Sequence, residues 1–167
     1  MSRKNTKTKI EAQVGMLLGV ISDTHGLLRP EALHSLREAK LIIHAGDVGA
    51  PEILVQLKNI APVFAVRGNV DTQPWAGQLP EKAVVEVAGL CLYLLHNLRE
   101  LDLKPEASGF QAVISGHTHQ PEQQERNGVL YLNPGSAGPK RFHLPVTLAL
   151  LDVTEKPLRA KIVRLPF

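Results

Sequence analysis

The sequence contains a single cysteine, Cys91, among 167 residues. No intrachain disulfide can therefore form, which suits a reducing compartment. A chain of this length fits one domain and can bury about 70% of the surface that its unfolded form exposes, so it needs no disulfide to hold a core. Cys91 lies in the apolar run 89–95, and we expect a small buried hydrophobic side chain there rather than a nucleophile.

Aromatic residues make up only 4% of the chain, and the net charge is a modest +3. Much of the positive excess lies near the two ends, and no basic stripe is interleaved with aromatic residues. Sequence-specific binding of nucleic acid is therefore not indicated. The scarcity of aromatic rings also argues against a surface that stacks single-stranded bases.

No apolar run approaches 18 residues, so a transmembrane helix is not predicted. The apolar segment 14–21 leads directly into polar residues 22–25 without a small-residue cleavage site, which argues against a signal peptide. We therefore expect a cytoplasmic protein that does not associate with membranes. Residues 1–12 are predicted to be a disordered extension and residues 13–167 a single domain.

Short apolar runs alternate with helical patterns in the first half of the chain, which indicates a parallel sheet. Helices are predicted over residues 30–39 and 51–58, and few helices are expected after residue 108. Strands are predicted over residues 16–21, 41–43, 63–66, 83–87, 90–95, 111–114, 129–132, 146–151 and 160–163. The pattern is typical of a mixed α/β domain with two packed sheets, the second largely antiparallel.

Five polar patches each lie at the end of an apolar, strand-like run. They are Asp23-Thr24-His25, Gly46-Asp47, Gly68-Asn69, His96-Asn97 and Gly116-His117-Thr118-His119. Ligands bind at the strand ends of open α/β sheets because side chains from several strands converge there. Carboxylates, imidazoles and amide oxygens are metal ligands, so the sequence predicts a metal site at these ends.

The spacing within the patches supports a shared site. Residues two apart in an extended segment point to the same face, so Asp23 and His25, like His117 and His119, can aim two ligands at one cavity. Taken alone, each patch has an ordinary structural explanation: His96 as a hydrogen-bonded structural histidine, Asp47 as a turn or helix-cap residue. Their joint occurrence at strand ends is what favours a metal site.

In order and spacing, the patches resemble the motifs of the calcineurin-like metallophosphoesterase superfamily. The residues that carry this resemblance are Asp23-x-His25, Gly46-Asp47, Gly68-Asn69-x-Asp71, His96 and Gly116-His117-x-His119. The small size of the chain and the segments 22–26 and 133–136 resemble the YfcE-type phosphodiesterase branch. The resemblance covers residues 15–153, nearly the whole chain.

The resemblance implies a metallophosphatase fold, a four-layer α/β/β/α sandwich with two divalent metal ions at the strand ends. It assigns the ligands as Asp23, His25 and His119 for the first ion, Asn69, His96 and His117 for the second, and Asp47 between the two. Asp47, Asn69 and His117 are also the residues expected to act in catalysis. Manganese is the expected metal, with nickel, iron or zinc as substitutes, because a ligand set without thiolate does not choose among them.

The charges of such a site favour phosphate chemistry. Two divalent ions outweigh two carboxylates and a hydroxide, so the site attracts a phosphate anion. Paired metals stabilise the attacking and leaving oxygens of an in-line displacement and lower the pKa of bound water. We therefore expect hydrolysis of a small phosphate ester, and the resemblance favours a phosphodiester.

The sequence departs from the family pattern at Val70, where many members carry a histidine after the Gly-Asn pair. Without that histidine, we expect weak general-acid assistance and a preference for good leaving groups.

Four further features remain candidates around the site. Asp71 is expected to orient a ligand histidine through a hydrogen bond. Arg141 is a candidate contact for the substrate phosphate, with a solvated loop as the alternative. His44 precedes Gly46-Asp47 and could support a ligand or simply pack in the core. The apolar segment 73–77 is a candidate exposed loop or contact, compatible with a homo-oligomer.

Three other functions compete with a phosphodiesterase. The retromer complex contains a subunit of this fold that serves binding rather than turnover, but every expected ligand position here holds a residue that can bind metal. A phosphomonoesterase is a second rival, because the same pair of ions would accept a dianion. A mononuclear metal sensor is a third, and no segment of the sequence supports it.

Overall fold

The computed structural model describes residues 6–10 and 16–166, and it builds them into two packed β-sheets. The larger sheet has the strand order β1-β5-β6-β7-β9-β8, and the smaller has the order β11-β10-β2-β3-β4. The strands of the larger sheet are β1 (Thr6–Ile10), β5 (Lys82–Val87), β6 (Leu90–Leu95), β7 (Ala112–Ile114), β9 (Val129–Asn133) and β8 (Glu122–Arg126). Those of the smaller sheet are β11 (Ala160–Arg164), β10 (Thr147–Asp152), β2 (Leu17–Ile21), β3 (Leu41–His44) and β4 (Val63–Ala65).

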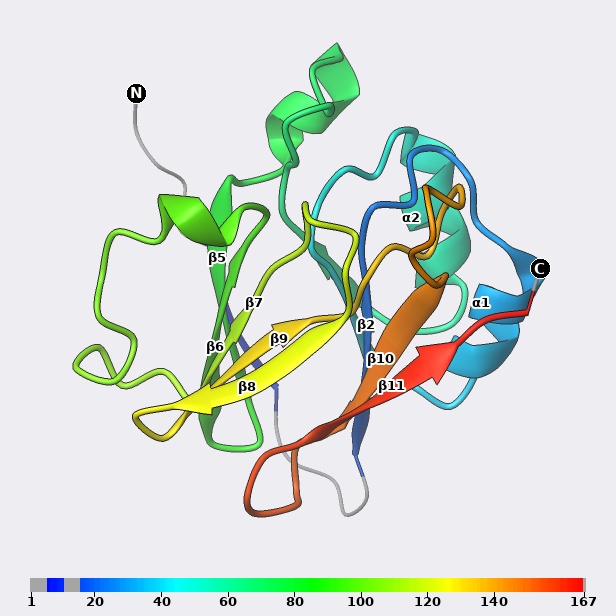
Figure 1. Cartoon of the computed structure of the whole chain (residues 1–167). Helices are drawn as coiled ribbons and strands as arrows, with labels where there is room; N and C mark the ends of the chain where they lie inside the picture. The colour runs from blue at the N-terminus through cyan, green and yellow to red at the C-terminus, as the bar shows by residue number, and fades with distance from the viewer. Residues whose placement is uncertain (1–5, 11–15, 167) are drawn as a thin grey trace.

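The smaller sheet is built from the strand–helix alternation that the sequence predicts. Strands β2, β3 and β4 pair in parallel, with helix α1 (Pro30–Leu36) and helix α2 (Pro51–Lys58) as the crossovers. Each helix begins at a proline, which has no N–H to leave unpaired in the first turn. Both helices pack on the outer face of this sheet, on the right of Figure 1.

The larger sheet is mixed. Strands β5 and β6 form a hairpin that turns at Ala88-Gly89, and β8 and β9 form another that turns at Asn127-Gly128. Both residues of each turn have positive φ, the backbone that a tight two-residue hairpin requires. Strands β6, β7 and β9 run parallel, so β6 and β7 end at the same edge of the sheet.

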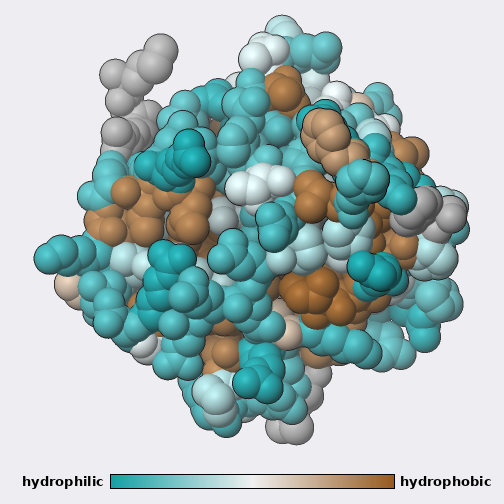
Figure 2. Space-filling model, in the orientation of Figure 1, coloured by the Kyte–Doolittle hydropathy of each residue, from teal (hydrophilic) through white to brown (hydrophobic). Residues whose placement is uncertain are grey.

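The apolar residues gather in three layers. One cluster fills the space between the sheets, and a second lies between the smaller sheet and the two helices. A third covers the outer face of the larger sheet, where Tyr93, Leu95 and Val113 pack against the segment that follows β6. Figure 2 shows hydrophobic residues on the left of this face, where this segment lies, and further hydrophobic patches on the right.

The mixed α/β class with two packed sheets is confirmed, and some details differ. Among the described residues, the outer layer over the larger sheet contains a 3-10 turn (η2, Leu98–Glu100) and irregular chain rather than an α-helix. A second 3-10 helix, η1 (Pro74–Gln78), lies after β4. Strand β8 was not expected, because its five residues are polar and exposed and carry no apolar pattern.

Two expectations near the ends of the chain and at the cysteine need correction. The disordered extension expected over residues 1–12 is not met at residues 6–10, which form β1 in parallel with β5; residues 1–5, 11 and 12 lie outside the described residues. Cys91 is half-buried rather than buried, and its Sγ lies 3.8 Å from a carboxylate oxygen of Glu86.

Among the described residues, no helix could span a lipid bilayer.

Candidate metal centre

The polar patches meet at one edge of the two sheets. Loops after β2, β3 and β4 of the smaller sheet carry Asp23, Asp47 and Asn69, and loops after β6 and β7 of the larger sheet carry His96 and His117. Parallel strands point the same way, so their carboxyl ends converge. The sandwich then brings the two sets of loops face to face.

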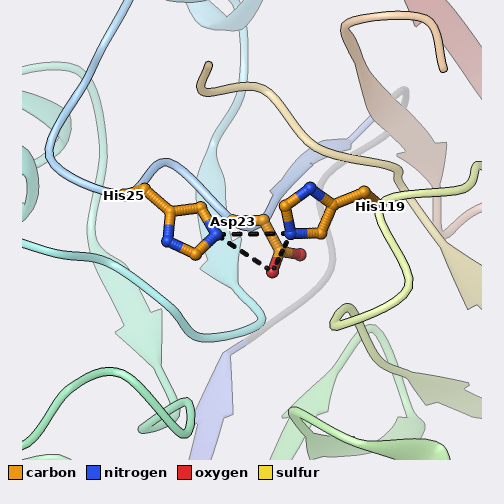
Figure 3. A group of neighbouring side chains, drawn as sticks. All are labelled: Asp23, His25 and His119. Carbon is orange, nitrogen blue, oxygen red and sulfur yellow. Dashed lines mark hydrogen bonds and ion pairs between the residues drawn. The ribbon is translucent and has the colours of Figure 1, made fainter. Parts of the chain in front are cut away.

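A first group of candidate ligands consists of Asp23, His25 and His119. The Nε2 atom of His119 lies 3.2 Å from Asp23 Oδ1 and 3.3 Å from His25 Nε2. Figure 3 shows the two rings turned toward one another from separate loops, with the Asp23 carboxylate between them. Three donor atoms this close, from residues up to 96 positions apart, make a compact candidate site for a cation.

A second group consists of Asp23, Asp47 and His96. The Asp47 Oδ2 atom lies 3.1 Å from His96 Nε2 and 3.8 Å from His25 Nε2. Asp47 thus stands between the histidines of the two groups. Asp23 Oδ1 also faces both, at 3.9 Å from His96 Nε2.

Asn69 and His117 lie at the exposed margin of the second group. Their Oδ1 and Nδ1 atoms are 3.2 Å apart, and the His117 ring stands edge-on to that of His96 with centroids 5.2 Å apart. All seven predicted ligands are therefore in one neighbourhood. His117 and His119, although two residues apart, face different parts of it.

The buried donor atoms suit a divalent cation. Asp23 Oδ1 and His96 Nε2 are inaccessible to solvent and make no hydrogen bond with the described residues. A buried carboxylate oxygen without a partner is costly unless an ion neutralises it. Two carboxylates and several imidazoles supply oxygen and nitrogen donors for such an ion, so the chemistry of the donor set fits bound metal.

The ionisation of the site follows from its burial and its hydrogen bonds. Burial raises the pKa of Asp23, but the nearby His119 ring and the Ser22 hydroxyl outweigh burial and leave the pKa below its ordinary value. Asp47 behaves alike, since His96 and the Val70 N–H outweigh its burial and lower its pKa. Both carboxylates are therefore anionic at neutral pH.

His96 shows the opposite balance. Burial lowers the pKa of His96, but the Asp47 carboxylate and the Ala45 carbonyl outweigh burial and raise the pKa above its ordinary value. A carbonyl only accepts, so Nδ1–H donates to Ala45 over 2.7 Å and leaves Nε2 to face Asp47. In the absence of metal, the raised pKa extends to higher pH the range in which Nε2 holds a proton that a cation must displace.

Metal affinity is therefore expected to rise with pH through the neutral range. Below the raised pKa of His96, binding releases a proton, and affinity should gain up to about tenfold per pH unit until the ring is neutral. Calorimetric titration with Mn²⁺ between about pH 6 and 9 measures this slope. A His96→Gln variant should lose most of it, and an equally steep slope in that variant would contradict the assignment.

The backbone under the ligands is unusual. Five candidate ligands have positive φ: Asp23 (55°), His25 (45°), Asp47 (55°), His117 (73°) and His119 (62°). The two Asp/His-x-His segments are thus turns and not the extended segments expected from their spacing. Non-glycine residues in this region each cost about 1–3 kcal/mol, and such strain concentrates at functional sites.

Replacing His117 by glycine is expected to give a more stable metal-free protein than replacing it by alanine, by about 1 kcal/mol. Glycine tolerates a φ of 73° without the Cβ clash that alanine keeps. Urea denaturation with a chelator present measures the difference. The matched control is exposed Val55 in α2, where glycine should instead be less stable than alanine by about 1 kcal/mol. Equal stabilities at position 117 would contradict the strain.

Asp71 does not orient a histidine, which corrects the expectation from its spacing. Its buried carboxylate accepts hydrogen bonds from three backbone N–H groups, those of Val48 (3.1 Å), Gly49 (3.0 Å) and Gly68 (2.9 Å). Val48 and Gly49 follow Asp47 in the loop after β3, and Gly68 belongs to the loop after β4. Asp71 therefore holds the shape of the backbone that presents Asp47. The short side chain of an aspartate can accept hydrogen bonds from several N–H groups of adjacent turns.

His44 and Thr24 tie the loops after β2 and β3 together. His44 is fully buried, and burial lowers its pKa to about 4, so the ring is neutral. Its Nδ1 accepts from the Gly46 N–H, so Nε2–H donates to Thr24 Oγ1 over 3.0 Å. The Thr24 hydroxyl in turn donates to the Val48 carbonyl over 2.8 Å. His44 thus supports the loops that carry Asp23 and Asp47.

The segment 133–136 holds the ligand loops by hydrogen bonds. Asn133 Nδ2 donates to the Gly116 carbonyl (2.9 Å) and to Thr118 Oγ1 (3.0 Å). Ser136 Oγ donates to the Asp23 carbonyl over 3.0 Å. Sequence reasoning did not identify these supporting roles, or those of Ser22 and Thr24, because a polar residue beside a ligand gives no signal of its long-range partner.

Arg141 lies in an exposed loop near His25. Burial lowers the pKa of His25, and the positive charge of Arg141 adds to that effect. The neighbouring Phe142 is 88% exposed and has a φ of 52°. A cation in this position can approach an anion at the metal centre, so its role as a substrate contact stays a prediction.

Comparison with known proteins agrees with this site. Residues 16–156 match the model of the calcineurin-like phosphoesterase superfamily domain. A probable metallophosphoesterase of Methanothermobacter thermautotrophicus is 38% identical over 89% of this chain and 92% of its own. A phosphodiesterase of Methanocaldococcus jannaschii is 26% identical over 86% of this chain and 97% of its own. The crystal structure of Chaetomium thermophilum Vps29 shares the fold, with a TM-score of 0.72 and 19% identity over 90% of this chain and all of that one.

The matched region contains every residue of the two ligand groups. The match extends over most of the chain, and the relatives match over nearly their full length. The chain belongs to the calcineurin-like phosphoesterase superfamily, and its family and donor groups support a metal-dependent phosphoesterase.

Proposed function

We propose that this protein is a phosphodiesterase that works with two divalent cations. Asp23, His25 and His119 hold one cation, His96, Asn69 and His117 hold the other, and Asp47 is shared. The position of Asp47 Oδ2, 3.1 Å from His96 Nε2 and 3.8 Å from His25 Nε2, is the observation that carries this proposal. A carboxylate placed between two sets of histidines is suited to bridge two ions.

When bound, the cations would activate a water molecule and neutralise charge on the phosphoryl group. The chain contributes the rest. Asp23 and Asp47, both with lowered pKa, keep the ions in place as anions, and the hydrogen bonds of Asp71 fix the backbone beneath Asp47. His117 and Asn69, at the exposed margin, lie where a substrate can reach them.

The proposal favours a diester because a relative named as a phosphodiesterase aligns with nearly this whole chain. The test is hydrolysis of bis(p-nitrophenyl) phosphate and of p-nitrophenyl phosphate by chelator-treated protein, with Mn²⁺, Ni²⁺, Fe²⁺ or Zn²⁺ added back. We expect metal-dependent turnover, with the diester preferred. Preference for the monoester would favour a phosphomonoesterase, and inactivity with every metal would favour a binding protein of the same fold.

A strong dependence on the leaving group is expected from Val70. This side chain is 45% exposed beside Asn69 and has no acidic proton, while its N–H donates to Asp47 Oδ1 over 3.0 Å. General-acid catalysis contributes about 10²- to 10⁴-fold where it operates, so alkyl phosphodiesters should react more slowly than aryl ones by at least that range. Values of kcat/KM across substituted phenyl esters and alkyl esters measure this dependence. Near-equal values would contradict it, and a Val70→His variant should reduce the slope.

A further inference from the structure

A groove leads away from His117 along the larger sheet. It encloses about 530 Å³ and is lined by the loops after β6 and β7 and by strands β8 and β9. These strands lie at the front of Figure 1, beside β7. His117, Gly116 and Thr118 form one wall, so the groove begins at the margin of the metal centre. We call it the β8 groove.

The floor of the β8 groove follows from the alternation of strand residues. Glu122, Gln124 and Arg126 are two apart in β8 and line the groove together. Glu122 pairs with Asn133, which is hydrogen-bonded to the loop that carries His117. The Glu122 level is therefore the end nearest the metal centre, and Arg126 lies toward the far end.

The guanidinium of Arg126 is held in one orientation. Its Nε and Nη2 atoms both donate to Gln124 Oε1, over 3.1 and 2.9 Å, and its Cζ lies 5.0 Å from the centre of the Tyr131 ring. Neither Gln124 nor Tyr131 is a carboxylate, and Arg126 makes no ion pair with a carboxylate among residues 6–10 and 16–166. An exposed arginine is therefore oriented in advance while its full positive charge remains available.

The register of β8 places this charge at a fixed distance from the Glu122 end of the groove. The guanidinium is bound at the level of the Gln124–Tyr131 pair, two residues along β8 from the Glu122–Asn133 pair. Two residues of a strand span roughly 7 Å. Arg99 and Leu98, from the 3-10 turn after β6, also line the groove.

We propose that the β8 groove binds the non-reacting arm of the phosphodiester, and that this arm carries a second phosphate held by Arg126 and Arg99. The sugar-like or ring part of the arm would lie against Leu98, with Glu122 accepting a hydroxyl near the metal end. Guanidinium groups bind phosphate through paired N–H donors. The substrate class is then a small organic phosphodiester with a further phosphate on one arm. This inference rests on the proposed function.

The test uses two substrates that differ by one phosphate: the p-nitrophenyl ester of thymidine 5′-phosphate with and without a 3′-phosphate. We expect the 3′-phosphate to lower KM about tenfold, the effect of one well-placed charge-assisted contact. Arg126→Gln and Arg99→Gln should together remove this difference. Arg37→Gln, in the exposed turn after α1, is the matched control and should leave the difference intact.

Equal KM values for the two substrates would overturn the proposal, as would a difference that persists in the double variant. Calorimetry with thymidine 3′,5′-bisphosphate gives a readout that needs no turnover. Weaker binding by the double variant than by the Arg37→Gln control supports the groove, and equal binding overturns it. Absence of any hydrolysis would refute the phosphodiesterase instead, while this binding comparison would still decide the groove.

Discussion

Replacing Asp47 by asparagine is expected to lower kcat by at least about 10³-fold, or about 4 kcal/mol of transition-state stabilisation. The change removes one of two negative charges among the ligands, at the oxygen that lies between His96 and His25. Asparagine keeps an oxygen that can accept the Val70 N–H, so the loop should keep its shape. Turnover of bis(p-nitrophenyl) phosphate and metal content by mass spectrometry measure the effect.

Asp152→Asn provides the matched control for this variant. It makes the same chemical change at the end of β10, where the carboxylate accepts hydrogen bonds from Thr154. We expect activity and metal content of the control to match the unchanged protein. An Asp47→Asn variant that kept both metal uptake and turnover would contradict the shared carboxylate, and with it the two-cation proposal.

Replacing Gly68 by alanine is the second change with a large expected effect. A Cβ at this position would collide with the Asp47 backbone nitrogen and with Asp47 Oδ1, and it would come within 2.8 Å of Asp47 Cγ. The backbone atom cannot move aside, and Asp71 holds the Gly68 N–H at 2.9 Å. We expect metal affinity to fall about 10- to 100-fold and unfolding free energy to fall about 1–3 kcal/mol.

Gly77→Ala separates this contact from a general effect of removing a glycine. Gly77 lies in η1, and a Cβ there would meet no atom within 4 Å. Its stability should stay within about 0.5 kcal/mol of the unchanged protein, with metal affinity unaltered. Calorimetric titration and urea denaturation compare the two variants. A Gly68→Ala protein that bound metal as tightly as Gly77→Ala would show that Asp47 is not confined by Gly68.

Elements with a clear apolar period were predictable from the sequence. Helix α2 was predicted over 51–58 and forms over those residues, and β3 and β6 lie within a residue of their predicted bounds. Strand β8 was not predictable, since Glu122–Arg126 is an exposed edge strand whose pairing with β9 depends on backbone hydrogen bonds. Its side chains bury no apolar face that could leave a period in the sequence.

Some features of the candidate metal centre were likewise predictable from the sequence, and others were not. Ligand-capable residues at strand ends were identified because strand ends and residue types are local properties. The expectation that Asp71 orients a ligand histidine was wrong. Its place two residues after Asn69 does not reveal that the N–H groups of Val48 and Gly49 donate to its carboxylate. The turns at Asp23 and His117 were also missed, since positive φ at a non-glycine residue is imposed by surrounding contacts.

Local patterns in the sequence predict the strand–helix alternation, the kinds of donor groups and their place after strands, because these features depend on neighbours a few residues away. Which donors meet depends on how the chain packs in three dimensions. His25 and His119 stand 94 residues apart in the chain yet have ring nitrogens 3.3 Å apart, and Arg126 is oriented by a neighbouring strand. Such contacts arise when two sheets pack, and no local pattern of side chains encodes the distance between them.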